Sequence, residues 1–283
     1  MKIILGDNPF FSINHRIGPS ESPAVKIEQL EKVLTSFLKL GGETMMLSVQ
    51  PGYEGALKVI QQVNQSSEKE LQLALVIPSL HTWNKLVAEG GWTALIKECI
   101  RNFVSAINMR SIRSAFIWKS FPYSQMFTFL IQDQKKLAMK MGIKVSHICL
   151  HNVFVDMLLG TQNGKKLLDS FLVACKAEGV LPVIITQNIK NLMDLEISGR
   201  FTVCFSLNSK GYMVNPDLKS VISEINEAKN NTNRNKIEMW AMQALASGAV
   251  DAKAAREFLE KENIDAMVYG TSRQERITQI FSE

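Results

Sequence analysis

Residues 264–281 read IDAMVYGTSRQERITQIF, and the rest of the chain is best interpreted outward from this stretch. Ile264–Tyr269 has the length and apolar character of a buried strand, and a helical pattern starts a few residues later. The turn between them, Gly270–Arg273, is short and begins with glycine. A turn that leads from a strand into a helix offers backbone N–H groups and the positive end of the helix dipole to an anion. The stretch therefore predicts an anion-binding turn at the carboxyl end of a sheet.

Seven further apolar runs precede this strand and alternate with amphipathic helical segments. The expected strands are residues 2–5, 44–49, 71–77, 145–150, 183–186, 201–206 and 237–242. Strands that are each followed by a helix form a parallel sheet, and eight of them without a break in composition predict a closed barrel. No Gly-x-Gly-x-x-Gly follows the first strand, which argues against an open nucleotide-binding sheet. The predicted fold is α/β: a single (β/α)8 TIM barrel domain over residues 1–283.

A long connection joins the third and fourth predicted strands. Residues 79–144 are expected to form an extended helical insertion, with a helix near 125–141 that buries Met126, Leu130, Ile131, Leu137 and Ala138. Residues 115–119 fit a strand as well as an irregular helix, and the count of eight strands favours the helix.

The same connection is basic and aromatic. Residues 101–144 hold eight basic residues and one acidic residue, interleaved with aromatic residues. Such a segment either packs its aromatic residues on the barrel and exposes its lysines, or binds an anionic surface. It carries no firm nucleic-acid signal.

Composition limits the classes of protein that the chain can belong to. It has 283 residues, 46% hydrophobic residues and a net charge of +5, so it can bury a large core. No segment approaches the roughly 18 uninterrupted apolar residues of a membrane span. The four cysteines are widely spaced and none forms a Cys-x-x-Cys pair, which predicts buried free thiols in a cytoplasmic protein. Its oligomeric state cannot be read from the sequence.

In a barrel of this class the active site lies at the carboxyl ends of the strands. His151 follows the fourth strand, where a period of two puts it on one face with His147 and Cys149. This face should line the lumen, so His151 at the mouth is placed for acid–base or polarising chemistry. His147 lies about 13 Å deeper by strand rise, so we expect no metal between the two histidines and no metal site elsewhere.

Other polar residues follow the remaining strands. Asp7 and Tyr53 are the further catalytic candidates. Each remaining Asn or Ser could instead cap a loop, which is the commoner role of these residue types. The expected substrate- or anion-binding residues are Asn8, Asn152, Gln187, Asn188, Gln243, Gly270, Thr271, Ser272 and Arg273.

Several of these motifs resemble the aldo-keto reductases. Ala241–Gly248 reads AMQALASG, similar to the family's AYSPLASG, and Gly270–Ile277 follows the family's Gly-Thr-Ser-x-x-Glu-Arg-Ile. Gln187-Asn188 stands where the family has Ser-Asn, and Tyr53 and His151 stand at the positions of its catalytic Tyr and His. The resemblance covers residues 44–60 and 145–283, and it implies a reductase barrel with a nicotinamide cofactor. It also implies that Arg276 would hold the 2′-phosphate of NADP.

The chain departs from the family at three places. Ser48 replaces the family's catalytic Asp, the third strand ends without the catalytic Lys, and Gln279-Ile280 replaces the acidic pair that contacts the adenine. Three functions therefore remain open. The first is an enzyme acting on a small anionic or phosphorylated metabolite, such as a lyase or isomerase. The second is a divergent NADP-dependent oxidoreductase, and the third is a non-catalytic scaffold or surface-binding barrel.

Overall fold

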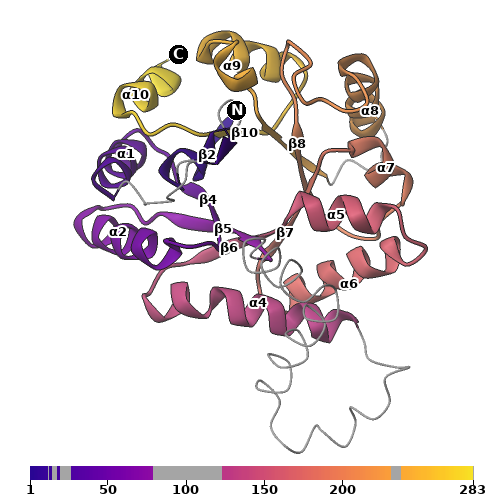
Figure 1. The fold of residues 1–283 in the computed structure, drawn as a ribbon, viewed down its shortest axis with the longest axis horizontal. Coiled ribbons are helices and arrows are strands. Elements are labelled where there is room, and N and C mark those ends of the chain that lie inside the picture. The colour runs from indigo at the N-terminus through magenta and orange to yellow at the C-terminus, as the bar shows by residue number, and fades with distance from the viewer. Residues whose placement is uncertain (12, 15–17, 20–26, 79–122, 231–236, 283) are drawn as a thin grey trace, which may run out of the picture.

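The structure, a computed structural model, describes residues 1–11, 13–14, 18–19, 27–78, 123–230 and 237–282. Eight parallel strands close into a barrel in the order β1-β10-β9-β8-β7-β6-β5-β4, which confirms the predicted fold (Figure 1). A two-stranded ribbon, β2 (Ile13–Asn14) and β3 (Gly18–Pro19), follows β1 outside the barrel. The strands of the barrel are β1 (Lys2–Gly6), β4 (Thr44–Ser48), β5 (Gln72–Ile77), β6 (Val145–Leu150), β7 (Leu181–Thr186), β8 (Thr202–Ser206), β9 (Glu238–Met242) and β10 (Ala266–Tyr269).

Helices surround the barrel and follow its strands (Figure 1). Their apolar faces pack on the outward side chains of the strands and form the main core. No helix of the described ranges combines the length and apolar character that a bilayer span requires. The described helices are α1 (Ile27–Lys39), α2 (Tyr53–Ser66), α4 (Tyr123–Lys140), α5 (Asn152–Leu159), α6 (Gly164–Ala177), α7 (Ile189–Asp194), α8 (Leu218–Asn230), α9 (Ala252–Lys261) and α10 (Gln274–Ser282), with short 3-10 turns η1 (Asn8–Phe11) and η3 (Ala246–Gly248).

The lumen of the barrel is filled by a second, smaller apolar cluster. Ile4, Met46, Cys149, Cys204 and Trp240 are members of this cluster, each from a different strand. Cys149 thus faces inward while Ile148 and Leu150 join the outer core, as the period of two predicts. The lumen is thus a packed core, so we expect chemistry at the ends of the barrel.

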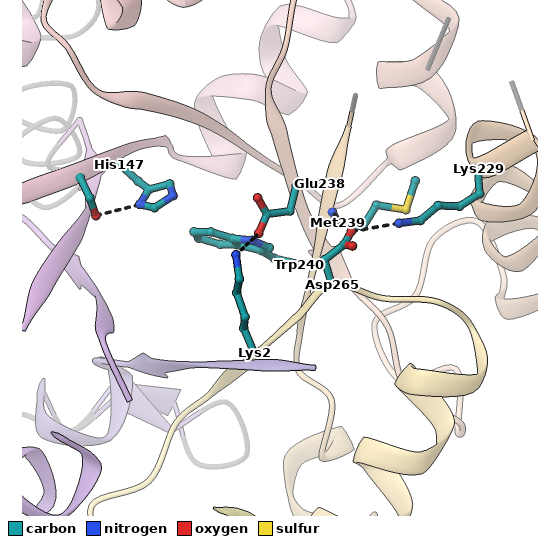
Figure 2. A network of polar contacts seen from close by, with 8 residues as sticks. Lys2, His147, Lys229, Glu238, Met239, Trp240 and Asp265 are labelled. Carbon is teal, nitrogen blue, oxygen red and sulfur yellow. Dashed lines mark hydrogen bonds and ion pairs between the residues drawn. The ribbon is translucent and has the colours of Figure 1, made fainter. Parts of the chain in front are cut away.

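One end of the lumen is closed by a polar network (Figure 2). Glu238 accepts hydrogen bonds from the indole N–H of Trp240 at 3.1 Å and from Lys2 at 3.4 Å. The ring of His147 packs against Trp240 with 5.1 Å between ring centroids. Lys2 and Glu238 are the first residues of β1 and β9, so the network lies at the amino-terminal end of the barrel. His147 belongs to this closure and lies far from the mouth.

Helix α5 corrects the expected path of the chain after β6. We expected His151 and Asn152 in a loop and the next helix near residue 165. Instead, α5 begins at once: His151 is its N-cap and Asn152 its first residue. The segment NVFVDMLL was missed because it is short and its N-cap is a histidine, which is not among the common capping residues.

The insertion is described only from Tyr123 onward, where α4 packs on α6. The predictions for residues 79–122, including the alternatives for 115–119, and those for residues 231–236 fall outside the described residues. Within α4, Met126 is 39% exposed, so its predicted burial is wrong, and Phe127 packs inward. Phe127 makes edge-on contacts with Phe154 of α5 and Phe171 of α6.

The lysines of α4 do not all face solvent. Lys135 is buried and forms an ion pair with Glu178 at the end of α6, while Gln132 donates to the same carboxylate at 2.6 Å. Lys136 and Lys140 are exposed. The idea that this segment exposes all its lysines is therefore wrong for Lys135, and binding of an anionic surface stays a prediction.

Replacing Lys135 with Met is expected to lower the free energy of unfolding by about 2 kcal/mol, because Glu178 then keeps a nearly buried charge without its cation. Urea denaturation measures the loss. Lys136→Met, one residue along and exposed, should change stability by less than about 0.5 kcal/mol. Adding Glu178→Gln to Lys135→Met should restore much of the loss, and equal stabilities of Lys135→Met and Lys136→Met would contradict a structural role for the pair.

Candidate active site

Asp7 lies at the mouth of the barrel, directly after β1. Its side chain is only 4% exposed, and its Oδ2 accepts a hydrogen bond from the backbone N–H of Ser48 at 2.6 Å. Burial raises the pKa of Asp7 to about 6, although the bonds from Ser48 act in the opposite direction. A carboxyl group with this pKa exchanges a proton near neutral pH. Asp7 therefore lies against Ser48, the position where the resemblance expects the catalytic Asp.

Tyr53 begins α2 in the turn after β4. Its backbone N–H donates to the carbonyl of Gln50 at 2.9 Å, and Gly52 has φ of 92°, a left-handed conformation that favours glycine. The hydroxyl of Tyr53 and the Nε2 of Gln50 are buried without a hydrogen-bond partner in the described part of the chain. Burial raises the pKa of the Tyr53 hydroxyl. Tyr53 can thus bind an oxygen atom but releases its proton poorly.

His151 caps α5 through its ring. The Nδ1 atom accepts a hydrogen bond from the backbone N–H of Val153 at 3.2 Å, and the backbone N–H of His151 donates to the carbonyl of Ile77 at the end of β5. Burial lowers the pKa of His151 to about 4, so the ring is neutral at physiological pH. Because Nδ1 is an acceptor, the single ring proton must be on Nε2. His151 can therefore donate a hydrogen bond from Nε2 while staying uncharged.

A row of side chains crosses the mouth from β7 to β9. The Oγ of Ser206 lies 2.8 Å from the Oε1 of Gln187 and 2.9 Å from the Oε1 of Gln243. A hydroxyl has one proton, so it donates to one of these two amide oxygens at a time. The Nε2 of Gln243 lies 3.3 Å from the sulfur of Met213, which fixes the orientation of that amide. Ser206 thus links the two amides through their oxygen atoms, and the Nε2 of Gln187 can donate to a ligand.

The backbone that carries Gln187 is held by Asp156 of α5. Asp156 accepts hydrogen bonds from the hydroxyl of Thr186 and from the backbone N–H of Gln187, and Thr186 in turn accepts from the N–H of Asn188 at 2.9 Å. Burial raises the pKa of Asp156. The sequence pattern missed Asp156 because it lies inside a helix, and it missed Ser206 because it reads as part of a buried strand.

The asparagine candidates have mainly local roles. Asn188 caps α7 by accepting from the N–H of Asn191 at 3.2 Å, and Asn152 is the partly exposed first residue of α5. Asn8 begins η1 and is partly exposed. Asn208 is fully buried and its amide bonds both Tyr212 and the carbonyl of Gln243. Asn208 thus stabilises the loop after β8 and donates a hydrogen bond to the backbone carbonyl of Gln243.

The turn from β10 to α10 approaches the loop after β1. A Cβ on Gly270 would lie 3.3 Å from the ring of Pro9, so glycine allows the close approach of the two loops. Thr271 is buried, and its hydroxyl accepts from the N–H of Arg273 at 3.1 Å. Ser272 is partly exposed. Arg273 and Arg276 are exposed at this turn and form no ion pair with a described residue, so both cations can bind an anion.

The structure places the three catalytic candidates at the same end of the barrel. In the barrel order, β1 (Asp7) neighbours β4 (Tyr53), and β5 separates β4 from β6 (His151). Adjacent strands lie about 4.8 Å apart, so one small molecule can reach all three strand ends. The described part of the chain has no group of three or more His, Cys, Asp or Glu side chains arranged to hold a metal ion. The mouth offers a neutral donor, a carboxyl group, a phenol that has no partner in the described ranges, and a row of amides.

Neither a family model nor a curated protein sequence matches this chain. Solved structures with the same fold do match. A Pseudomonas aeruginosa protein described as an aldo-keto reductase superposes with a TM-score of 0.58 and 12% identity, over 99% of this chain and 88% of that one. The holo form of a Bacillus halodurans aldo-keto reductase gives 0.56 and 11%, over 99% and 85%.

A glycerol dehydrogenase from Gluconobacter oxydans gives a TM-score of 0.51 and 10% identity, over 99% of this chain and 85% of that one. At sequence identities this low, the superpositions show that the three-dimensional fold is shared. The agreement spans nearly the whole chain, including regions on both sides of the insertion. The chain therefore has the fold of the aldo-keto reductase barrels.

Proposed function

We propose that the chain is a divergent NADP-dependent oxidoreductase of the aldo-keto reductase type that acts on a small carbonyl compound. The observation that carries this proposal is the state of His151 at the mouth: its neutral ring has a fixed Nε2–H donor. A neutral imidazole can polarise a carbonyl oxygen without trapping it as an ion pair, and it keeps this form over the whole physiological pH range. The shared barrel fold supports the same assignment.

The residues at the mouth fit a nicotinamide cofactor. The Nε2 of Gln187, whose Oε1 accepts from Ser206, can donate to the carbonyl oxygen of a carboxamide group. Arg273 and Arg276 provide exposed cations for phosphate groups at the β10–α10 turn. Gln279 is exposed and available to an adenine, whereas Ile280 is packed in the core. A bound nicotinamide would supply the hydride for carbonyl reduction.

The chain's own residues would then handle the carbonyl oxygen and its proton. His151 donates a hydrogen bond from Nε2, and the hydroxyl of Tyr53, which has no partner among the described residues, can donate to the same oxygen. Burial holds the pKa of Tyr53 above its ordinary value, so we assign the exchange of the proton to Asp7, whose pKa lies near neutrality. In this assignment Asp7 takes the proton-transfer role of the family's Tyr.

A second function is favoured by the same pair of groups. A carboxyl base near pKa 6 and a neutral imidazole electrophile are also the groups that an isomerase or lyase uses to enolise a carbonyl compound. Such an enzyme would act on a small anionic or phosphorylated metabolite held at Arg273, without nicotinamide. The two functions differ in their need for the cofactor, so cofactor binding distinguishes them.

We expect NADPH to bind, with an increase in its fluorescence, and Arg276→Ala to raise its Kd by about tenfold because one phosphate–guanidinium contact is lost. Arg273→Ala should have a similar effect. Arg200→Ala is the control, since Arg200 is also exposed but precedes β8 at the other end of the barrel. No binding at millimolar NADPH would exclude the oxidoreductase. Thermal stabilisation by inorganic phosphate that Arg273→Ala abolishes would then favour the isomerase or lyase.

A further inference from the structure

We propose that Asp156 is a positioning residue that holds Gln187 in place to bind the carboxamide of the nicotinamide cofactor. This inference rests on the proposed function and adds a residue that has no counterpart in the sequence motifs. Asp156 does not face a ligand itself. It acts through the backbone of the β7–α7 turn.

The contacts of Asp156 define this role. Both carboxylate oxygens receive the backbone N–H of Gln187, at 3.1 Å for Oδ2 and 3.3 Å for Oδ1. Oδ1 also accepts from the hydroxyl of Thr186, which is fully buried. Thr186 in turn fixes the backbone of Asn188, because its Oγ1 accepts a hydrogen bond from the N–H of Asn188 at 2.9 Å. One carboxylate thus fixes three consecutive residues at the point where β7 ends.

The same turn is tied to its neighbours through the side chain of Gln187. Ser206 of β8 lies 2.8 Å from the amide of Gln187 and 2.9 Å from that of Gln243 after β9. A continuous chain of hydrogen bonds therefore runs from α5 through the ends of β7 and β8 to β9. Gln243 has φ of 57°, an uncommon conformation for a residue other than glycine, and Asn208 supports its carbonyl. The amide row is held at both ends, by Asp156 and by Asn208.

The place of Asp156 in α5 is unusual for an acid. It is the only charged residue in the helix NVFVDMLL, and it faces β7 with partial burial. Burial and the nearby apolar residues make a carboxylate costly here, so its hydrogen bonds to the turn offset that cost. Backbone hydrogen bonds alone can form a turn of this kind. The carboxylate of Asp156 adds a constraint on the backbone of Gln187, and thereby on the direction of its side-chain amide.

The experiment separates the two halves of the cofactor. Nicotinamide mononucleotide carries the carboxamide, and 2′,5′-ADP carries the adenine and the 2′-phosphate. Calorimetry should show that Asp156→Ala and Asp156→Asn raise the Kd of nicotinamide mononucleotide by about tenfold. The Kd of 2′,5′-ADP should stay unchanged. In Asp156→Asn the amide can still accept one bond, but its NH2 group faces a donor, so this variant keeps the shape of the side chain and loses half of the contacts.

Asp169→Asn is the matched control. Asp169 of α6 also holds a backbone N–H, that of Ser198 at 2.8 Å, in the loop that leads into β8. The Asp169→Asn variant should lose about as much stability as the Asp156→Asn variant. It should bind both halves of the cofactor as wild type does. Thr186→Val should reproduce the Asp156 effect in weaker form.

The outcomes are distinct. If wild type binds NADPH and the Asp156 variants bind both halves as wild type does, Asp156 has no positioning role. If the Asp156 variants lose affinity for both halves of the cofactor equally, the effect is general destabilisation and the inference fails. If wild type binds neither NADPH nor either half, the proposed function itself is wrong. Selective loss of nicotinamide mononucleotide supports the role proposed for Asp156.

Discussion

Replacing His151 with asparagine is expected to lower kcat for carbonyl reduction by about 100- to 1000-fold, while the protein stays folded. Asparagine is a preferred N-cap, so its side chain can accept the N–H of Val153 in place of the imidazole. What is lost is the Nε2–H donor, for which a short amide has no equivalent in reach. Steady-state kinetics with NADPH and a panel of small aldehydes and ketones, together with circular dichroism, measure both effects.

His147→Asn provides the control for this experiment. Both histidines are partly buried and in both burial lowers the pKa to about 4, but His147 lies in the network at the amino-terminal end of the lumen. His147→Asn should lower thermal stability and leave kcat unchanged. An equal loss of kcat in both variants would show that His151 acts only through the fold.

The pH dependence of stability follows from the same two histidines. Their folded pKa values lie below the unfolded value of about 6.5, so the stability they contribute is complete above pH 6.5 and is lost as pH falls towards 4. His151 should accordingly titrate near pH 4 in nuclear magnetic resonance spectra. No inflection at pH 6.5 in kcat/KM is expected from this residue.

The barrel could be predicted because its strands are buried on both faces. Runs such as Val183–Ile185 are apolar throughout, and helical patterns separate them, so the alternation alone indicates a parallel sheet. Boundaries were off by one or two residues where polar residues begin a strand, as at Glu238. Helix α5 was missed because NVFVDMLL is apolar on more than one face and its cap is His151. A buried short helix and a strand look alike in such a pattern.

The candidate site could be predicted only where a residue follows a strand directly. Asp7, His151 and Gln187 were found in this way, and the structure places them at the mouth. The supporting residues were not found, because their roles depend on contacts between distant segments: Asp156 reaches the end of β7 across 31 positions of sequence, and Ser206 lies between two glutamines from other strands. The buried position of Lys135 was missed for the same reason, since its partner Glu178 ends another helix.

Asp7→Asn is expected to raise the free energy of unfolding by about 3 kcal/mol at pH 8 and to change it little at pH 4. Burial raises the pKa of Asp7 from its ordinary 3.8 to about 6, a difference of about two units at about 1.4 kcal/mol each. The sign follows from linkage: the folded state binds the proton more tightly, so its stability is greatest at low pH and falls as pH rises through 6. Asparagine removes the charge and can still accept the N–H of Ser48.

Urea denaturation at several pH values measures this difference, with Asp194→Asn as the control because Asp194 is an exposed acid at the end of α7. Asp194→Asn should have the same free energy of unfolding as wild type at every pH. A lower stability of Asp7→Asn at pH 8 would contradict the raised pKa of Asp7. The same substitution should lower kcat at neutral pH by at least about tenfold, because an amide cannot exchange the proton. A buried acid whose removal stabilises the fold but impairs turnover is kept for its chemistry, and this combination identifies Asp7 as catalytic more firmly than loss of activity alone.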